Sequence, residues 1–130
     1  MPANTIANNG LTGIEVSGGT GAQIAGNSIY ANGGLGIDLG GDGVDVNDTA
    51  DLDTGPNNRQ NAPVLYNVAI SDTNTIVNGL FSGTPNDDFV VDVFASQSCD
   101  DSGFGEGQTY LGSVFPVADG AGNGGFSFTH

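Results

Sequence analysis

The sequence predicts an all-β protein, in which the end of a parallel β-solenoid of about two coils precedes a partial immunoglobulin-like antiparallel β-sandwich. Three observations predict this class. Glycine supplies 23 of the 130 residues and charged residues make up only 12%, the reverse of a helical composition. The N-terminal third repeats with a fixed period. The C-terminal half contains short apolar runs separated by polar turns.

Residues 1–41 repeat with a period of 23 residues. Asn4-Thr5-Ile6 recurs as Asn27-Ser28-Ile29, and Gly13-Ile14-Glu15-Val16 recurs as Gly36-Ile37-Asp38-Leu39. Each repeat contains two short strands separated by an Asn-Gly corner, where the backbone turns with positive φ. A period of this length is too short for two helices and fits one coil of a parallel β-solenoid.

Stacked coils of a solenoid place equivalent positions above one another. The equivalent pairs are Ile6 with Ile29, Ile14 with Ile37, and Asn9 with Asn32. We expect the isoleucines to stack inside and the asparagines to stack at the corners. A pair of similar glycine-rich hairpins is the alternative interpretation. Because each coil buries its apolar face only against its neighbours, two coils suggest the cut edge of a longer solenoid.

Residues 42–61 form an Asp/Gly/Asn-rich loop between the two predicted domains. At about 20 residues the loop exceeds an ordinary connection, which indicates a functional or ion-stabilised segment or a flexible linker. Carboxylate and amide oxygens are the ligands that Ca²⁺ takes, and a divalent ion would relieve repulsion among crowded carboxylates. The candidate metal ligands are Asp42, Asp45, Asn47, Asp48, Asp51 and Asp53. Their spacing is not that of an EF-hand, so a solvated acidic loop is the alternative interpretation.

Residues 62–130 alternate between apolar and polar positions. The apolar runs are predicted as strands at residues 64–70, 75–81, 89–95, 109–115 and 125–128. Polar turns separate these strands, which favours an immunoglobulin-like sandwich. Because such sandwiches usually have about seven strands, we expect this one to be truncated. The acidic segment from Cys99 to Glu106 is expected to be the loop between the third and fourth strands.

The chain carries a formal charge of −14, with 15 acidic residues, one arginine and no lysine. We therefore expect neither nucleic acid nor an anionic membrane surface as a partner, because both are bound through Lys and Arg. No apolar run reaches the roughly 18 residues of a membrane span, so no membrane insertion is expected.

The sequence offers little for nucleophilic catalysis. His130 is the only histidine and Cys99 the only cysteine, so Ser-His-Asp or Cys-His chemistry lacks a well-placed base and no internal disulfide can form. Cys99 is expected to be a small buried residue. Phe104 is expected to fold over the edge of the sandwich, and an exposed aromatic that stacks on a ligand is the alternative interpretation. We therefore predict that the chain is not an enzyme.

Three segments together resemble the C-terminal region of large exported bacterial right-handed parallel β-helix repeat proteins. The segments are NSIYANGGLGIDLGGDGVDVND, DTGPNNRQNAPVL and FASQSCDDSGFGEGQTYLGS. The resemblance implies a right-handed solenoid that runs into an Asp-rich loop and then an immunoglobulin-like sandwich. It also implies a bacterial secreted or cell-surface protein that continues beyond this chain at both ends. It carries over no catalytic residue.

Two functional hypotheses follow. The first is a non-catalytic structural and interaction module for adhesion or an extracellular scaffold, stabilised by Ca²⁺ and contacting extracellular polysaccharide or a surface protein. The second is a fragment of a carbohydrate-active β-helix protein that binds polysaccharide or cleaves it as a lyase or a hydrolase. Glu15 and Asp38 would stand about 4.8 Å apart on successive coils, as a carboxylate pair for glycoside chemistry. Two solvated carboxylates on an outward-facing strand are the alternative interpretation of this pair.

Overall fold

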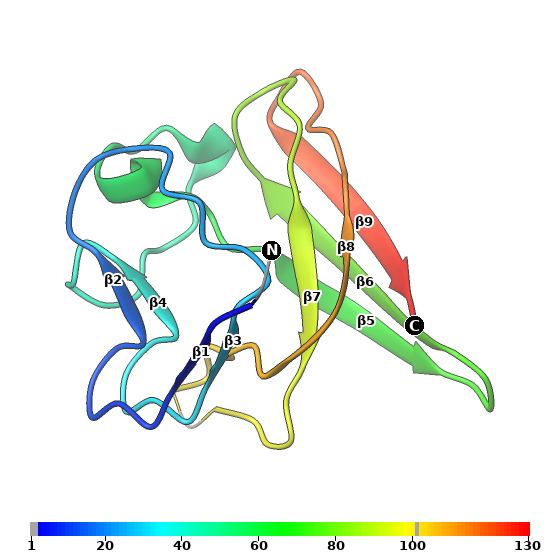
Figure 1. Cartoon of the computed structure of the whole chain (residues 1–130). Coiled ribbons are helices and arrows are strands. Elements are labelled where there is room, and N and C mark those ends of the chain that lie inside the picture. The colour runs from blue at the N-terminus through cyan, green and yellow to red at the C-terminus, as the bar shows by residue number, and fades with distance from the viewer. Residues whose placement is uncertain (1–2, 101) are drawn as a thin grey trace. The chain divides into compact units, whose positions relative to one another are not determined.

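The computed structural model describes residues 3–100 and 102–130, and this part of the chain is all-β, as predicted. Its strands are β1 (Thr5–Ala7), β2 (Ile14–Val16), β3 (Ser28–Tyr30), β4 (Ile37–Leu39), β5 (Val64–Ile70), β6 (Thr75–Ser82), β7 (Val91–Ala95), β8 (Thr109–Val114) and β9 (Asn123–Thr129) (Figure 1). Two short 3₁₀ turns, η1 (Thr49–Asp51) and η2 (Pro56–Arg59), lie between β4 and β5. Residues 1–2 of the predicted solenoid segment and Asp101 of the predicted acidic loop lie outside the described residues.

The chain divides into two compact units. The first comprises Met1–Asp45, Thr54–Arg59 and Phe94–Gly112, and the second comprises Val46–Asp53, Gln60–Val93 and Ser113–His130. The loop of residues 42–61 therefore contributes to both units. The first unit also includes a segment from far along the chain.

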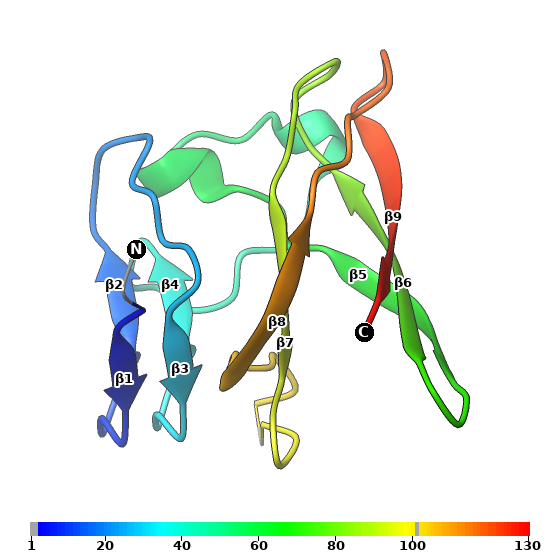
Figure 2. The same cartoon turned by 45° about the vertical axis from the view of Figure 1, so that its right-hand side comes forward.

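In the first unit, the sequence repeat pairs its own strands in parallel. β1 pairs with β3, which sets Ile6 opposite Ile29, and β2 pairs with β4, which sets Ile14 opposite Ile37. Figures 1 and 2 show β1 beside β3 and β2 beside β4. Because each partner lies one repeat further along the chain, the strand register equals the sequence period. The predicted isoleucine pairings are confirmed.

Asparagine side chains repeat the same register at the corners. The Nδ2 of Asn9 donates to Oδ1 of Asn32 at 2.7 Å, and the backbone N–H of Asn9 donates to the same oxygen at 3.1 Å. Asn4 and Asn27 repeat this arrangement, with an Nδ2 to Oδ1 distance of 3.0 Å. An amide side chain both donates and accepts, so it can join successive strands in a ladder. The predicted stacking of Asn9 on Asn32 is confirmed.

The interior of the first unit is small and only partly apolar. Ile29 and Val16 are buried, with 5% and 8% of their surface exposed. Ile37, expected inside, is 42% exposed, so that prediction is wrong. β4 is the last strand of its two-stranded sheet, and the described part of the chain places no further coil beyond it to cover this side chain.

A short segment of the β7–β8 connection, residues 105–108, lies along β3. The Ile29 N–H donates to the carbonyl oxygen of Gly107 at 2.8 Å, and Ser28 Oγ donates to that of Gln108 at 2.5 Å. The Glu106 carboxylate accepts from Asn32 twice, from Nδ2 at 2.7 Å and from the backbone N–H at 3.2 Å. Glu106 therefore binds Asn32 in the same way that Asn32 binds Asn9, and it ends the ladder.

The second unit contains an antiparallel sheet with the strand order β5–β6–β9. β7 and β8 pair in a separate two-stranded sheet, and each of these two strands has residues in both units. The buried core consists of Phe81, Ala118 and Phe126, with Phe89, Val91 and Val114 packed against it. Across the sheet, Gly79 pairs with Phe126 and Gly124 pairs with Phe81. A Cβ at either glycine would overlap the facing ring, so both positions require glycine.

The strands of the C-terminal half lie within two residues of their predicted bounds. Two strand starts differ by two residues: β9 begins at Asn123 rather than at Gly125, and β7 begins at Val91 rather than at Phe89. Phe89 instead donates its N–H to the carbonyl oxygen of Pro116 at 2.9 Å, next to an isolated bridge between Asp88 and Val117. This separate pairing accompanies the loss of Phe89 and Val90 from the predicted strand.

Candidate metal-binding site

The acidic loop turns sharply at η1 because two consecutive residues adopt left-handed backbone conformations. Ala50 has φ 60° and Asp51 has φ 56°. Such values cost a residue with a Cβ about 1–2 kcal/mol. The N–H of Ala50 donates to Ser82 Oγ at 3.0 Å, which ties the turn to the end of β6. The turn brings the residues before and after it to one side.

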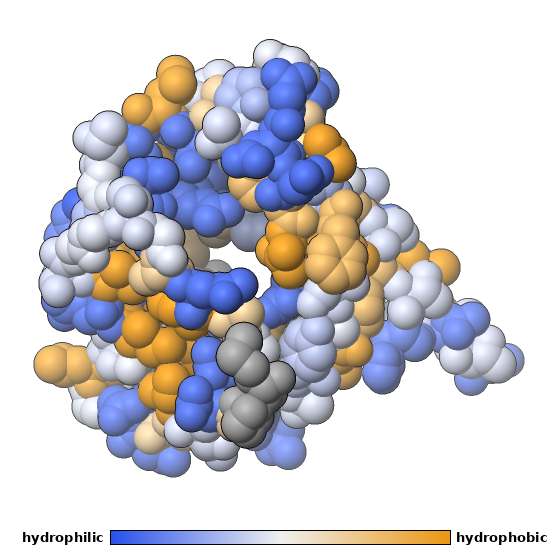
Figure 3. All heavy atoms as spheres, turned by 45° about the horizontal axis from the view of Figure 1, so that its top comes forward, coloured by the Kyte–Doolittle hydropathy of each residue, from blue (hydrophilic) through white to orange (hydrophobic). Residues whose placement is uncertain are grey.

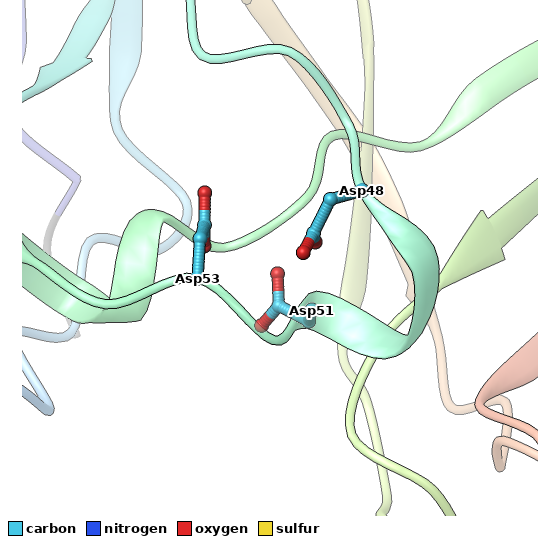
Figure 4. Close-up of side chains that lie close together, drawn as sticks. All are labelled: Asp48, Asp51 and Asp53. Atoms are coloured by element: carbon cyan, nitrogen blue, oxygen red, sulfur yellow. The ribbon is translucent and has the colours of Figure 1, made fainter.

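Three of the predicted metal ligands lie together at this turn. They are Asp48, Asp51 and Asp53, and one carboxylate oxygen from each lies within 4.8 Å of the others. Figure 4 shows the carboxylates of Asp48 and Asp51 pointing toward one another, with Asp53 beside them. Three carboxylates at this separation repel one another and are chemically suited to a hard cation such as Ca²⁺.

Asn61 organises the backbone around these carboxylates. Its Oδ1 accepts the N–H of Asp48 at 2.8 Å, its Nδ2 donates to the carbonyl oxygens of Asp48 at 2.8 Å and Ser82 at 3.0 Å, and its own N–H donates to Asp51 Oδ1 at 2.8 Å. The Asn61 side chain is buried. Sequence reasoning missed this residue, because no local pattern distinguishes it from the other asparagines of the loop.

The surroundings of Asp51 disfavour its ionised form. Burial raises the pKa of Asp51, the hydrogen bond from Asn61 opposes this shift, and the charges of Asp53 and Asp48 raise the pKa further. Oδ1 of Asp53 is buried and accepts no hydrogen bond from the described residues. Leaving a buried carboxylate oxygen without a partner costs free energy. A bound cation would satisfy this oxygen and favour the ionised form of Asp51.

The other three predicted ligands have different partners. Asp42 forms a salt bridge with Arg59, with Nη2 2.9 Å from Oδ2, and Asp45 pairs with the same guanidinium. The hydrogen bond from Arg59 lowers the pKa of Asp42. Asn47 binds the backbone of Ala62 twice, as donor at 2.7 Å and as acceptor at 2.9 Å. These side chains hold the loop, while the three clustered carboxylates remain the metal candidates.

The Glu15–Asp38 pair has the predicted register, since the two residues lie opposite each other in β2 and β4. Asp38 is only 5% exposed, so its interpretation as a solvated carboxylate is wrong. Its Oδ1 accepts the N–H of Gly41 at 3.0 Å, within its own turn. A Cβ at Gly41 would lie 2.8 Å from the Glu15 carboxyl carbon, so Glu15 packs against the same turn.

The second acidic segment also differs from its prediction. Cys99, expected to be buried, is exposed. Phe104 is 52% exposed. Hydrogen bonds from the Ser102 side chain and backbone lower the pKa of Asp100, so this carboxylate belongs to a local turn. These residues therefore form a solvated loop, with Glu106 as its inward-pointing member.

Comparison with protein-family models and with curated proteins gives no match to this chain. Within residues 3–100 and 102–130, none of the helical segments has the length and apolar character needed to cross a membrane. The carboxylate cluster and the pairing of the strands are therefore the observations on which a functional proposal rests.

Proposed function

We propose that the chain is a non-catalytic structural and interaction module of a secreted or cell-surface bacterial protein, stabilised by Ca²⁺. In this proposal the first unit is the end of a right-handed parallel β-solenoid, and the second is a partial immunoglobulin-like sandwich. The proposal extends to adhesion or scaffolding, with extracellular polysaccharide or a surface protein as the partner. Its bacterial and extracellular elements rest on the resemblance described above.

The one-repeat register of both parallel strand pairs supports the solenoid. β1 and β3 pair at the same offset as β2 and β4, and the Asn4–Asn27 and Asn9–Asn32 contacts follow that offset at the corners. Stacked equivalent strands with corner amide ladders are typical of solenoids. The antiparallel β5–β6–β9 sheet and its Phe81–Phe126 core support the sandwich in the same way.

The roles of Glu15 and Asp38 support the non-catalytic part. Glycoside hydrolysis by two carboxylates needs both acids open to substrate in a cleft. Asp38 is buried and accepts a hydrogen bond from its own turn, and Glu15 packs against Gly41 of that turn. Asp38 therefore has a structural role at the end of β4, and the exposed Glu15 lacks a second acid that is open to substrate.

The cluster of Asp48, Asp51 and Asp53 carries the calcium part of the proposal. Ca²⁺ takes six to eight oxygen ligands, so the three carboxylates would supply part of the shell, and water or backbone oxygens the rest. An ion there would cancel the mutual repulsion of the carboxylates and provide a partner for Asp53 Oδ1. It would also fix the turn at Ala50 and Asp51, where the backbone is left-handed.

Thermal unfolding in Ca²⁺ and in EDTA tests the proposal. Extracellular modules bind Ca²⁺ with Kd values on the order of 10⁻⁴ M. About 10 mM Ca²⁺ would then stabilise the folded chain by roughly 2.7 kcal/mol, because the ion binds only the folded state. For a chain of this size the Tm should rise by roughly 10 °C.

Two variants make this test specific to the cluster. Asp53→Asn should abolish the Ca²⁺-dependent rise in Tm, because it removes a ligand and its charge. Asp72→Asn, which removes the same charge from the β5–β6 turn, should leave the rise intact. Identical melting curves in Ca²⁺ and EDTA, or an equal loss in both variants, would show that the calcium proposal is wrong.

A further inference from the structure

The β5–β6–β9 sheet of the second unit has an exposed edge at β5. This strand is the outer member of the sheet and is exposed along all seven residues. Its large apolar side chains are 52% to 80% exposed and belong to Val64, Leu65, Tyr66, Val68 and Ile70. A long apolar edge with unpaired backbone groups is a template for another strand. Figure 3 shows apolar (orange) side chains among polar (blue) ones on one face of the molecule.

Both faces of β5 contribute to this apolar surface. Val68 lies opposite Val77 and Ile70 opposite Thr75, on the face of β6 that also carries Phe81 of the core. On the other face, Val64 lies opposite Leu80, which is itself 55% exposed. A strand added at this edge would therefore bury apolar side chains on both of its sides.

The usual protections of an exposed edge are nearly absent from β5. Natural edges carry Lys, Pro or inward-pointing charges. The strand sequence VLYNVAI contains none of these. One β-bulge interrupts the pairing with β6 between Leu65 and Asn67, and the remaining residues, Asn67–Ile70, pair regularly. The regular stretch is thus open for pairing on its outer side.

Charge identifies the kind of strand that fits this edge. The chain carries −14 overall, yet β5, β6 and β9 contain no charged residue. A cationic partner would be drawn to the acidic loops, whereas this sheet offers only apolar contacts and backbone hydrogen bonds. An uncharged, apolar strand is the complementary partner, and β5 is itself such a strand.

We propose that β5 pairs antiparallel with β5 of a second copy of the chain, forming a two-fold symmetric dimer with a continuous six-stranded sheet. With the two-fold axis at Val68, this residue faces its own copy on the core side, and Asn67 faces Ala69 on the other. A symmetric pairing of this kind uses the same surface on both partners and closes at two copies. It also removes the exposed edge from each of them.

Sedimentation equilibrium of the whole chain over a concentration series tests this pairing. The weight-average mass should rise from that of one chain toward that of two. Ile70→Lys places a charge in the interface and should raise the dimer Kd by at least about tenfold. Leu11→Lys makes the same change at a side chain that is 79% exposed, against 80% for Ile70, but in the first unit, and should leave the Kd unchanged.

Salt and cross-linking give independent readouts. Two copies with like charge repel one another, so added NaCl should strengthen the dimer by screening. Val68→Cys in a Cys99→Ser background should form an interchain disulfide on mild oxidation, whereas Leu11→Cys in that background should not. A chain that stays monomeric at all concentrations, or a dimer weakened equally by both lysine variants, would overturn the proposal.

Discussion

Removing the Glu106 carboxylate should destabilise the first unit, because this side chain ends the asparagine ladder. Asn32 is 9% exposed, and its side chain uses its full hydrogen-bonding capacity. Its Oδ1 accepts twice from Asn9, and its Nδ2 donates to the Ile6 carbonyl oxygen at 3.2 Å and to Glu106 at 2.7 Å. Its backbone N–H also donates to Glu106, at 3.2 Å.

The cost of Glu106→Ala follows from these two hydrogen bonds. A hydrogen bond to a charged group contributes about 1.5–3 kcal/mol, and an orphaned buried donor costs about 1–3 kcal/mol. Because Glu106 is only half-buried, water can replace part of the loss, and we expect Glu106→Ala to lower the free energy of unfolding by about 2–3 kcal/mol. Glu106→Gln keeps one acceptor oxygen and should cost about half as much.

Urea unfolding of the variants measures the loss in the free energy of unfolding. Asp72→Ala is the control, because it also removes one negative charge from the acidic chain. A double-mutant cycle with Asn32→Ala should give a coupling energy of about 1–2 kcal/mol, since the two residues share the lost bonds. Amide exchange of Asn32 should accelerate in Glu106→Ala. Additive effects, or a change in unfolding free energy below about 0.5 kcal/mol, would refute this account of the ladder.

Two further predictions concern the second unit. The pKa of Asp51 is raised in the folded chain, so the ionised carboxylate lowers the free energy of unfolding. This loss of stability is absent below the usual pKa of 3.8 and grows as the pH rises through the folded-state pKa. In EDTA at pH 7, Asp51→Asn should therefore have a higher Tm than the parent chain, and in Ca²⁺ it should have a lower one. A Tm of Asp51→Asn below that of the parent chain in EDTA would contradict the prediction. Gly79→Ala should lower stability by about 1–3 kcal/mol, because the added Cβ overlaps the Phe126 ring. Gly10→Ala, where a Cβ meets nothing within 4 Å, is its control, and equal denaturation midpoints for both variants would disprove the packing explanation.

The sequence predicted the strand pairing of the first unit because that information is local and periodic. Ile6 and Ile29 occupy equivalent positions of a repeat, and parallel pairing of equivalent positions is the simplest way to satisfy both backbones. The C-terminal strands were predictable for a similar reason, since apolar alternation and turn residues bracket each of them.

The role of Glu106 was not predictable in this way. Its contact with Asn32 joins positions 74 residues apart, outside any repeat. Only the path of the β7–β8 connection brings the carboxylate to the end of the ladder. From its neighbours in the sequence, a glutamate in an acidic, glycine-rich segment is expected to be exposed to solvent.

The sequence predicted which loop carries the candidate metal ligands, but not which of those residues lie together. Six oxygen-bearing side chains were expected to act together. Arg59 holds Asp42 and Asp45, while the left-handed backbone at Ala50 and Asp51 groups the metal candidates. The residue types at this turn do not predict it, because alanine and aspartate adopt left-handed backbone conformations only at a cost in free energy.

Calcium titration calorimetry of the chelator-stripped chain tests the central claim most directly. The proposal predicts one Ca²⁺ bound per chain, with binding lost in Asp53→Asn and retained in Asp72→Asn. No binding heat, or binding that persists unchanged in Asp53→Asn, would contradict a calcium-stabilised module built on Asp48, Asp51 and Asp53.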